Sequence, residues 1–241
     1  MCGRFAQCSD SDVLAHHFGL ETTAIDVQPR YNIAPTQPVL TVCLTEDQQR
    51  RELVPLRWGL VPFWSKGPDN RYRMINARAE TVASKPAYRA AFRERRCLIP
   101  ADAFYEWQAG ASGKQPFAIR RTDRTPFAIA GLFEHWQGED GSVIDSCTII
   151  VTEANALLRP IHERMPVILD PVDYDTWLGT ERPSPEANKA RLQSLLKPAD
   201  PNGWEAYPIS RAVNTPAKDS PELLAPMTPA PSGNEPNART D

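Results

Sequence analysis

The sequence predicts an α+β fold: a mostly antiparallel, barrel-like β-sheet core with short peripheral helices. Strand-like stretches outnumber helical ones and do not alternate with them, as they would in a doubly wound parallel sheet. The chain also has 24 prolines spread along its length, which limit long uninterrupted helices. Its 241 residues are enough to bury a substantial core.

In the amino-terminal half, two predicted helices flank two predicted strands. Ser9–Leu20 offers Ser and Asp as caps, followed by apolar residues at helical spacing. Pro86–Arg96 begins with proline in its first turn and places two aromatic residues one turn apart. Apolar runs rich in β-branched residues predict the strands Pro38–Leu44 and Glu52–Leu60.

The carboxyl-terminal half holds most of the predicted strands. Their runs are apolar or aromatic and are bounded by turn-forming residues. These strands are Cys97–Trp107, Pro116–Arg120, Phe127–Trp136, Val143–Thr152 and Pro166–Leu169. The remaining predicted helices are Glu153–Leu158, Pro171–Leu178 and Pro185–Leu196.

The chain shows no internal repeat, and we expect a single domain over residues 1–225. The last sixteen residues, from Pro226 to Asp241, contain four prolines and almost nothing to bury. This composition predicts a disordered, Pro-rich tail over residues 226–241.

The composition excludes several classes of protein. The net charge of −3 gives no overall attraction to polyanions, so a nucleic-acid site must be a local patch. The chain has no run of about 18 apolar residues, and its first residues lack a basic stretch followed by an apolar one, so we expect neither a membrane span nor a secretory signal. Its five cysteines form no CxxC pair, and neither they nor the histidines have metal-ligand spacing. We therefore expect reduced thiols in the cytoplasm, with no metal, cofactor or membrane association.

A basic segment interrupts this acidic chain. Between residues 71 and 96, eight basic and two acidic residues give a local charge of about +6. Just upstream, the stretch RWGLVPFWSK carries Trp58, Phe63 and Trp64. Cations for phosphates and flat rings for bases are the mixture that binds single-stranded nucleic acid. A solvated helix face and core-filling tryptophans are the alternative interpretation.

The chain begins MCGRF, with a cysteine as its second residue. Methionine is normally trimmed before a small residue, which would leave Cys2 with a free α-amine beside its thiol. In such a 1,2-aminothiol, the thiol can attack a carbonyl while the amine serves as base. Alternatively, the amine can condense with an aldehyde to a Schiff base, which the thiol closes into a thiazolidine. An accidental cysteine at this position is the third possibility.

Three other segments hold polar residues in contexts that suggest chemistry. INARAET places Asn76 and Arg78 two apart, so a strand would turn both to one face. ADAFYEWQ puts Glu106 in an aromatic run, where burial would raise the carboxyl pKa toward the range useful for proton transfer. RPIHERMPVIL holds His162 just before an apolar strand, where a purely structural histidine is the alternative.

Together these segments resemble the SRAP family, the SOS response-associated peptidase or abasic-site processing proteins. The resemblance runs from Cys2 to about Asn214, and the ordered combination of motifs is highly specific. The matching motifs are MCGRF, RYNIAPTQ, WGLVPFW, INARAET, CLIPADAFYEW, KQPFAI, AGLFEHW, TIIVTEAN, IHERMPVIL and PISRAVN.

The resemblance implies the SRAP fold and covalent trapping of abasic sites in single-stranded DNA as a thiazolidine. Cys2 would be the nucleophile after autocatalytic removal of Met1, and Asn76 would orient it. Glu106 and His162 would move the protons. The candidate DNA contacts are Arg4, Arg78 and Arg164 for phosphates, and Trp58, Phe63, Trp64 and Trp107 for bases. We expect a monomer whose partner is single-stranded DNA with abasic sites, located at the nucleoid when bound.

Other functions fit parts of the sequence. A cysteine peptidase acting on other proteins would use Cys2 with His162 and Glu106 or Asn76, but nothing marks a peptide groove. A non-covalent single-strand binder would use only the basic and aromatic region. A lyase that cleaves the strand from a Schiff base would compete with thiazolidine closure.

Overall fold

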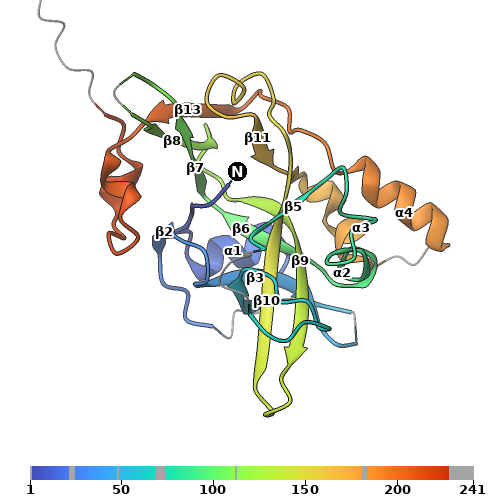
Figure 1. Ribbon diagram of the computed structural model, residues 1–241. Coiled ribbons are helices and arrows are strands. Elements are labelled where there is room, and N and C mark those ends of the chain that lie inside the picture. Colours follow the sequence, from blue (N-terminus) through green and yellow to red (C-terminus); the bar gives the residue numbers. More distant parts are fainter. Residues whose placement is uncertain are drawn as a thin grey trace, which may run out of the picture.

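Two β-sheets form the centre of the molecule, and short helices lie at its edges (Figure 1). The structure is a computed structural model that describes residues 2–21, 25–47, 49–68, 74–111, 113–180 and 184–227. In spatial order, the larger sheet contains β11 (Arg164–Pro166), β10 (Val143–Glu153), β4 (Arg51–Trp58), β3 (Pro38–Leu44), β6 (Arg96–Ala101), β9 (Phe127–Gln137) and β12 (Ile168–Leu169), with β5 (Asn76–Arg78) paired to β10. The smaller sheet contains β13 (Trp204–Pro208), β8 (Gln115–Arg121), β7 (Ala103–Gln108), β1 (Phe5–Gln7) and β2 (Arg30–Ile33).

The larger sheet closes into a barrel, because β10 pairs with β4 on one side and with β9 on the other. The circuit is completed by the pairs β4–β3, β3–β6 and β6–β9. These pairs are antiparallel, whereas β10 runs parallel to β4 and β5. The predicted α+β fold on a mostly antiparallel, barrel-like sheet is therefore confirmed.

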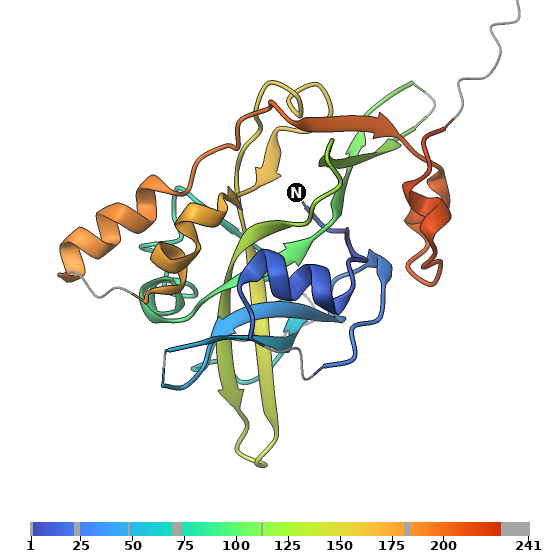
Figure 2. The same ribbon diagram turned by 180° about the vertical axis from the view of Figure 1, so that it is seen from behind.

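The helices are short, as the distribution of proline predicts. They are α1 (Ser11–Phe18), α2 (Arg89–Glu94), α3 (Tyr174–Leu178) and α4 (Pro185–Ser194), with 3-10 turns η1 (Pro171–Asp173), η2 (Arg211–Asn214) and η3 (Pro221–Leu224). Helix α1 begins after Asp10, whose carboxylate accepts a hydrogen bond from the Val13 amide, and ends at Gly19 in the left-handed region. It buries Leu14 and Phe18 and lies at the back of the molecule (Figure 2).

The predicted strand Cys97–Trp107 is in fact two strands, β6 and β7, which belong to different sheets. The chain changes sheets at Asp102. Its carboxylate accepts hydrogen bonds from the amides of Cys8 and Ser9, at 2.5 and 3.0 Å, and from the Ser9 hydroxyl. Three hydrogen bonds to the Asp102 carboxylate, from residues distant in the sequence, therefore fix this corner. The pattern of apolar residues alone does not reveal the change of sheet.

Two further predictions need correction. The helix predicted at Glu153–Leu158 is wrong, because β10 continues through Glu153 and the following residues form turns. The strand predicted at Pro166–Leu169 is divided at Val167, whose amide bonds to Ile150 of β10 and whose carbonyl accepts from Ala130 of β9. The sequence patterns also missed β1, β2, β5 and β13, which are three to five residues long and too short to show alternation.

The apolar core reaches the amino-terminal segment. Cys2 and Phe5 are fully buried in the same cluster as Trp58, and the rings of Phe5 and Trp58 meet edge to face at 5.0 Å. Cys43 and Cys147 are also buried free thiols. The core therefore fixes the position of the first residues of the chain.

The ordered chain extends into the segment predicted as a tail. Pro226 pairs with Ile209, and the Met227 amide donates to the Pro208 carbonyl at 2.9 Å. Residues 228–241 of the predicted tail lie outside the described residues. Within the described ranges, no helix is long and apolar enough to cross a membrane.

Candidate active site around Cys2

Cys2 lies where the two sheets approach each other. In Figure 1 the amino terminus lies between β7 and β8 on one side and β5 and β11 on the other. Asn76, the first residue of β5, donates a 2.8 Å hydrogen bond from Nδ2 to the Cys2 carbonyl. On the other side, the Tyr105 amide of β7 donates to the Arg4 carbonyl at 3.0 Å. The amino-terminal segment is thus held by a strand from each sheet.

Asn76 is positioned by the parallel pairing of β5 with β10, where it lies opposite Ile149. Within the described residues, its side-chain oxygen is buried and accepts no hydrogen bond. A buried acceptor without a donor is costly, so the site is suited to a donor from a bound group.

Glu106 lies on β7 opposite Phe117 of β8, and only 2% of its surface is exposed. Burial raises the pKa of its carboxyl to about 7, while the positive charge of the amino terminus pulls that pKa down. A carboxyl that titrates near neutrality can both accept and release a proton at physiological pH.

His162 follows the turns after β10, just before β11. Its Nδ1 accepts a hydrogen bond from the Arg164 amide at 2.9 Å and lies 3.3 Å from the Arg164 carbonyl. The amide can only donate and its contact is the shorter, so we assign the ring proton of the neutral form to Nε2. Burial and the charge of the amino terminus lower the His162 pKa. The neutral ring therefore presents Nε2–H as a hydrogen-bond donor.

The electrostatics connect these groups. The pKa of the Cys2 thiol is raised by burial and by the charge of Glu106, and it is lowered by the positive amino terminus. That same terminal charge acts on Glu106 and His162. The structure thus brings together the sequence-predicted residues Cys2, Asn76, Glu106 and His162. Their arrangement supplies a thiol, an amide and two groups that can exchange protons.

Lys114 is a residue that the sequence patterns missed. It is exposed at the end of the connection between β7 and β8, and its charge lowers the pKa values of both Glu106 and His162. The available signal was its place at the start of KQPFAI, directly before the strand that pairs with the one carrying Glu106.

Among the predicted base contacts, Trp58 offers no surface for stacking. It is fully buried, its indole Nε1 donates to the Ile75 carbonyl at 3.0 Å, and its ring packs on Phe5. The prediction of a DNA contact at Trp58 is therefore replaced by a core role. Phe63 and Trp64 are 55% and 58% exposed, and the Arg95 guanidinium lies over the Phe63 ring.

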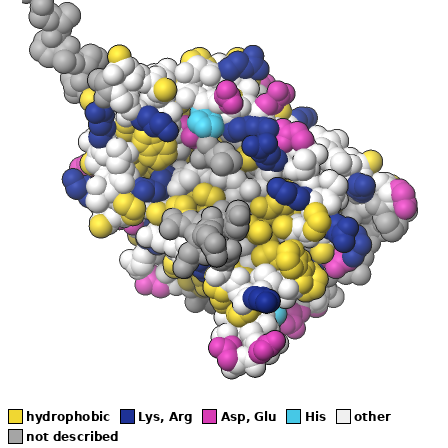
Figure 3. All heavy atoms as spheres, viewed as in Figure 1, with side chains coloured by type: hydrophobic (Ala, Val, Ile, Leu, Met, Phe, Trp, Pro, Cys, Tyr) yellow, Lys and Arg dark blue, Asp and Glu magenta, His cyan; other side chains and the backbone are white. Residues whose placement is uncertain are grey.

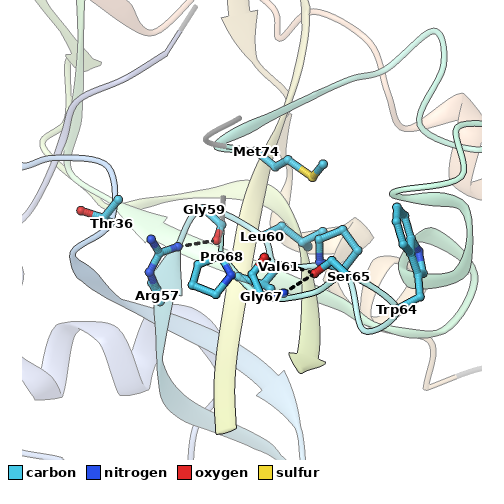
Figure 4. Close-up of a pocket in the computed structure, with 11 residues that line it drawn as sticks. Thr36, Arg57, Gly59, Leu60, Val61, Trp64, Ser65, Gly67, Pro68 and Met74 are labelled. Carbon is cyan, nitrogen blue, oxygen red and sulfur yellow. Dashed lines mark hydrogen bonds between the residues drawn. The ribbon is translucent and has the colours of Figure 1, made fainter. Parts of the chain in front are cut away.

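Trp64 lines a pocket of about 180 Å³ whose lining includes none of the four residues gathered at Cys2 (Figure 4). Its walls are largely apolar, and the Arg57 guanidinium lies among them, donating to the Gly59 carbonyl at 2.8 Å. Met74, which also lines the pocket, is two residues before Asn76. On this face of the molecule, hydrophobic side chains gather over the middle and Lys and Arg side chains border them (Figure 3).

Of the other predicted DNA contacts, three already form hydrogen bonds or ion pairs with other residues of the protein. The Trp107 indole donates to Asn214 Oδ1 at 2.8 Å, and Arg164 forms an ion pair with Glu80. Arg4 donates to Asn32 and to two backbone carbonyls, whereas Arg78 is exposed. The basic residues Arg71 and Arg73 lie outside the described residues.

A metal centre is not assembled in the part of the chain that the structure describes. No three His, Cys, Asp or Glu side chains come together there as possible ligands. The chemistry available from these residues is that of the thiol, the amide, the carboxyl and the imidazole.

Comparison with known sequences gives a family match over most of the chain. A model of the family described as SOS response associated peptidase (SRAP) matches residues 1–216. Abasic site processing protein YoqW of Bacillus subtilis (strain 168) is 42% identical over 227 residues, which cover 93% of this chain and 99% of YoqW. Abasic site processing protein YedK of Escherichia coli (strain K12) is 32% identical over 234 residues, with 94% and 100% covered. Abasic site processing protein HMCES of Gallus gallus is 33% identical over 231 residues, with 83% and 67% covered.

Solved structures share the architecture. A crystal structure of a protein from Bacteroides thetaiotaomicron superposes with a TM-score of 0.81 at 24% identity, covering 94% of this chain and all of that one. A phage-related protein from Bordetella bronchiseptica gives a TM-score of 0.69 at 29% identity, with 87% and 95% covered. The arrangement of sheets described above is therefore that of experimentally solved proteins.

Proposed function

The chain belongs to the SOS response associated peptidase (SRAP) family, and from this premise we propose that it processes abasic sites in single-stranded DNA by linking them covalently to Cys2. The choice of the abasic site as substrate rests on the names of its relatives, which are called abasic site processing proteins. The observation that carries the proposal is the position of Cys2, whose carbonyl is held by Asn76 and whose thiol lies within the electrostatic reach of Glu106.

The reaction begins with removal of Met1 by hydrolysis of its peptide bond to Cys2. The new α-amine attacks the C1′ aldehyde of the opened abasic sugar, and water leaves as a carbon–nitrogen double bond forms. The Cys2 sulfur then adds to that carbon, and the thiol proton passes to the nitrogen. The product is a thiazolidine that retains the nitrogen and sulfur of the aminothiol, and two of the aminothiol hydrogens leave with the aldehyde oxygen as the one water lost in total.

The neighbouring groups suit the proton transfers of this scheme. His162 Nε2–H would donate to the sugar ring oxygen as the ring opens. Glu106, with its pKa of about 7, would take a proton from the attacking amine and return one to the departing water. Asn76 Oδ1 would accept a hydrogen bond from the mature α-amine, which would supply the donor that this buried oxygen lacks among the described residues.

Single-stranded DNA suits the surface around this centre. The exposed rings of Phe63 and Trp64 would stack on bases that flank the lesion. Arg78, the residue two positions after Asn76, and Lys114, beside Glu106 and His162, would attract the backbone phosphates.

Denaturing electrophoresis tests the proposal. The mature protein, incubated with a single-stranded oligonucleotide that carries one abasic site, should give an adduct that survives denaturation, and an intact oligonucleotide should give none. Cys2→Ala should abolish the adduct. Cys8→Ala, which removes another free thiol near the amino terminus, should retain it. An adduct that persists in Cys2→Ala, or no adduct with the mature wild-type protein, would reject the proposal.

A further inference from the structure

The Arg4 side chain, two residues after Cys2, is engaged within the protein. Its Nη1 donates to Asn32 Oδ1 at 2.8 Å and to the Val213 carbonyl at 2.6 Å, and its Nη2 donates to the Asn214 carbonyl at 3.4 Å. These contacts use three of the five N–H donors of the guanidinium and hold it against the carboxyl-terminal segment. This arrangement favours a role inside the molecule.

Asn32 is the partner that organises this arrangement. It is fully buried on β2, and its Nδ2 faces the carbonyls of Val213, Thr215 and Lys218 at 3.2, 3.1 and 2.7 Å. The amide orientation is fixed chemically, because the guanidinium can only donate and the carbonyls can only accept. A single buried amide therefore holds both Arg4 and the backbone against which Arg4 packs.

The amino-terminal segment needs such an anchor because its strand is short. β1 has three residues, and its register with β2 shifts between Phe5 and Gln7. The backbone of Arg4 bonds to Tyr105, the residue before Glu106, and its carbonyl lies 3.9 Å from the Cys2 sulfur. Arg4 thus connects the nucleophile to the strand that carries the carboxyl.

We propose that Asn32 is a positioning residue for the reaction at Cys2. It fixes the Arg4 guanidinium against residues 213–214, and Arg4 in turn fixes Cys2 beside Asn76 and Glu106. The inference rests on the proposed function, and it replaces the phosphate contact expected of Arg4 with a structural link. Small displacements of a nucleophile lower reaction rates far more than they lower binding. Variants of Asn32 and Arg4 should therefore lose capture rate and keep their affinity for DNA.

Asp219 offers a matched control. Its carboxylate accepts from the amides of Tyr31 and Asn32 and from Arg30 Nε, so it ties the same carboxyl-terminal segment to β2. These bonds do not involve Arg4. Asp219→Asn weakens the tether of the segment and leaves the Asn32–Arg4 contact in place.

The test is single-turnover capture of an abasic oligonucleotide by the mature protein over a range of DNA concentrations. In Asn32→Ala and in Arg4→Met, the maximal rate constant should fall at least tenfold, while the half-saturating DNA concentration stays within twofold of wild type. The double variant should be no slower than the slower single variant, because both changes break one link. Asp219→Asn should stay within threefold of wild type in both quantities.

A maximal rate constant in Arg4→Met equal to that of wild type would overturn the proposal. So would an Arg4→Met defect confined to DNA affinity, with a weaker salt dependence, because that result would assign the guanidinium to a phosphate. If Asn32→Ala fails to fold, the half-exposed Arg4 side chain still permits the test through Arg4→Met.

Hydrogen–deuterium exchange without DNA separates this inference from the proposed function. Amides of Phe5–Gln7 should exchange faster in Asn32→Ala and Arg4→Met than in wild type or Asp219→Asn. Unchanged exchange in the first two variants would reject the positioning role, whatever happens with DNA. A wild-type protein that forms no adduct would instead reject the proposed function, and the exchange result would still stand.

Discussion

Cys2 and Asn76 are 74 residues apart in the sequence and are joined by one hydrogen bond of 2.8 Å, from the Asn76 amide nitrogen to the Cys2 carbonyl. β5 carries Asn76 because it pairs with β10 of the barrel, whereas the Cys2 segment leads into β1 of the smaller sheet. The bond therefore joins the two sheets at Cys2, the residue to which we assign the covalent step.

Asn76→Asp should slow covalent capture strongly. The substitution keeps the size of the side chain but removes the donor and places a carboxylate against the Cys2 carbonyl. We expect the single-turnover rate constant to fall about 10- to 100-fold through misplacement of Cys2. Because the change loses one hydrogen bond and also leaves the Cys2 carbonyl facing an acceptor, it should lower the free energy of unfolding by about 1–3 kcal/mol. Rapid-quench kinetics and urea denaturation would measure the two effects, and an unchanged rate constant would contradict the assignment.

Glu106 should make stability depend on pH. Its pKa is about 7 in the folded protein against 4.5 ordinarily, so the folded state binds the extra proton between these values. Stability is therefore fully present below pH 4.5 and is lost as pH rises through 7, by about 3 kcal/mol in total. Glu106→Gln should lack this component of the profile. Chemical denaturation of both proteins at pH 5 and pH 8 would show it, and parallel profiles would contradict the raised pKa.

Two tryptophans should respond in opposite ways. Trp64 is exposed, so Trp64→Ala should weaken single-strand binding by about 1–3 kcal/mol per stacked base and leave stability unchanged. Trp58 is fully buried, so Trp58→Ala should cost about 3–5 kcal/mol of stability. Fluorescence anisotropy with a labelled oligonucleotide and thermal unfolding would separate the two. Equal binding by wild type and Trp64→Ala would remove the stacking role.

Lys114→Gln should change both the salt dependence of DNA binding and the pH profile of covalent capture. Loss of one phosphate contact on a single strand lowers the slope of log affinity against log salt by about 0.7. Because the Lys114 charge lowers the pKa values of Glu106 and His162, its removal should shift both upward and move the pH profile of capture with them. Lys197, an exposed lysine on a separate cavity, provides a control in Lys197→Gln. An identical salt slope and pH profile in both variants would count against a role for Lys114.

The sequence was sufficient for the long barrel strands, because β3, β4, β9 and β10 have seven to eleven residues in clear apolar runs. It was not sufficient for β1 and β5, which have three residues each, yet these two strands position Cys2 and Asn76. The motifs identified the candidate residues without showing how they are held.

The burial of Trp58 and the engagement of Arg4 could not be predicted either, because both depend on contacts between distant segments. Trp58 packs on Phe5, and Arg4 bonds to residues more than 200 positions away. A local pattern of aromatic and basic residues does not distinguish a side chain that faces DNA from one that fills the core or ties the chain together.

The most direct measurement is the intact mass of the purified protein before and after incubation with a single-stranded oligonucleotide that carries one abasic site. The account predicts a chain that lacks Met1 and then gains the mass of the oligonucleotide minus one water, with no durable gain in Cys2→Ser. A chain without Met1 whose mass does not change on incubation would contradict covalent capture at Cys2.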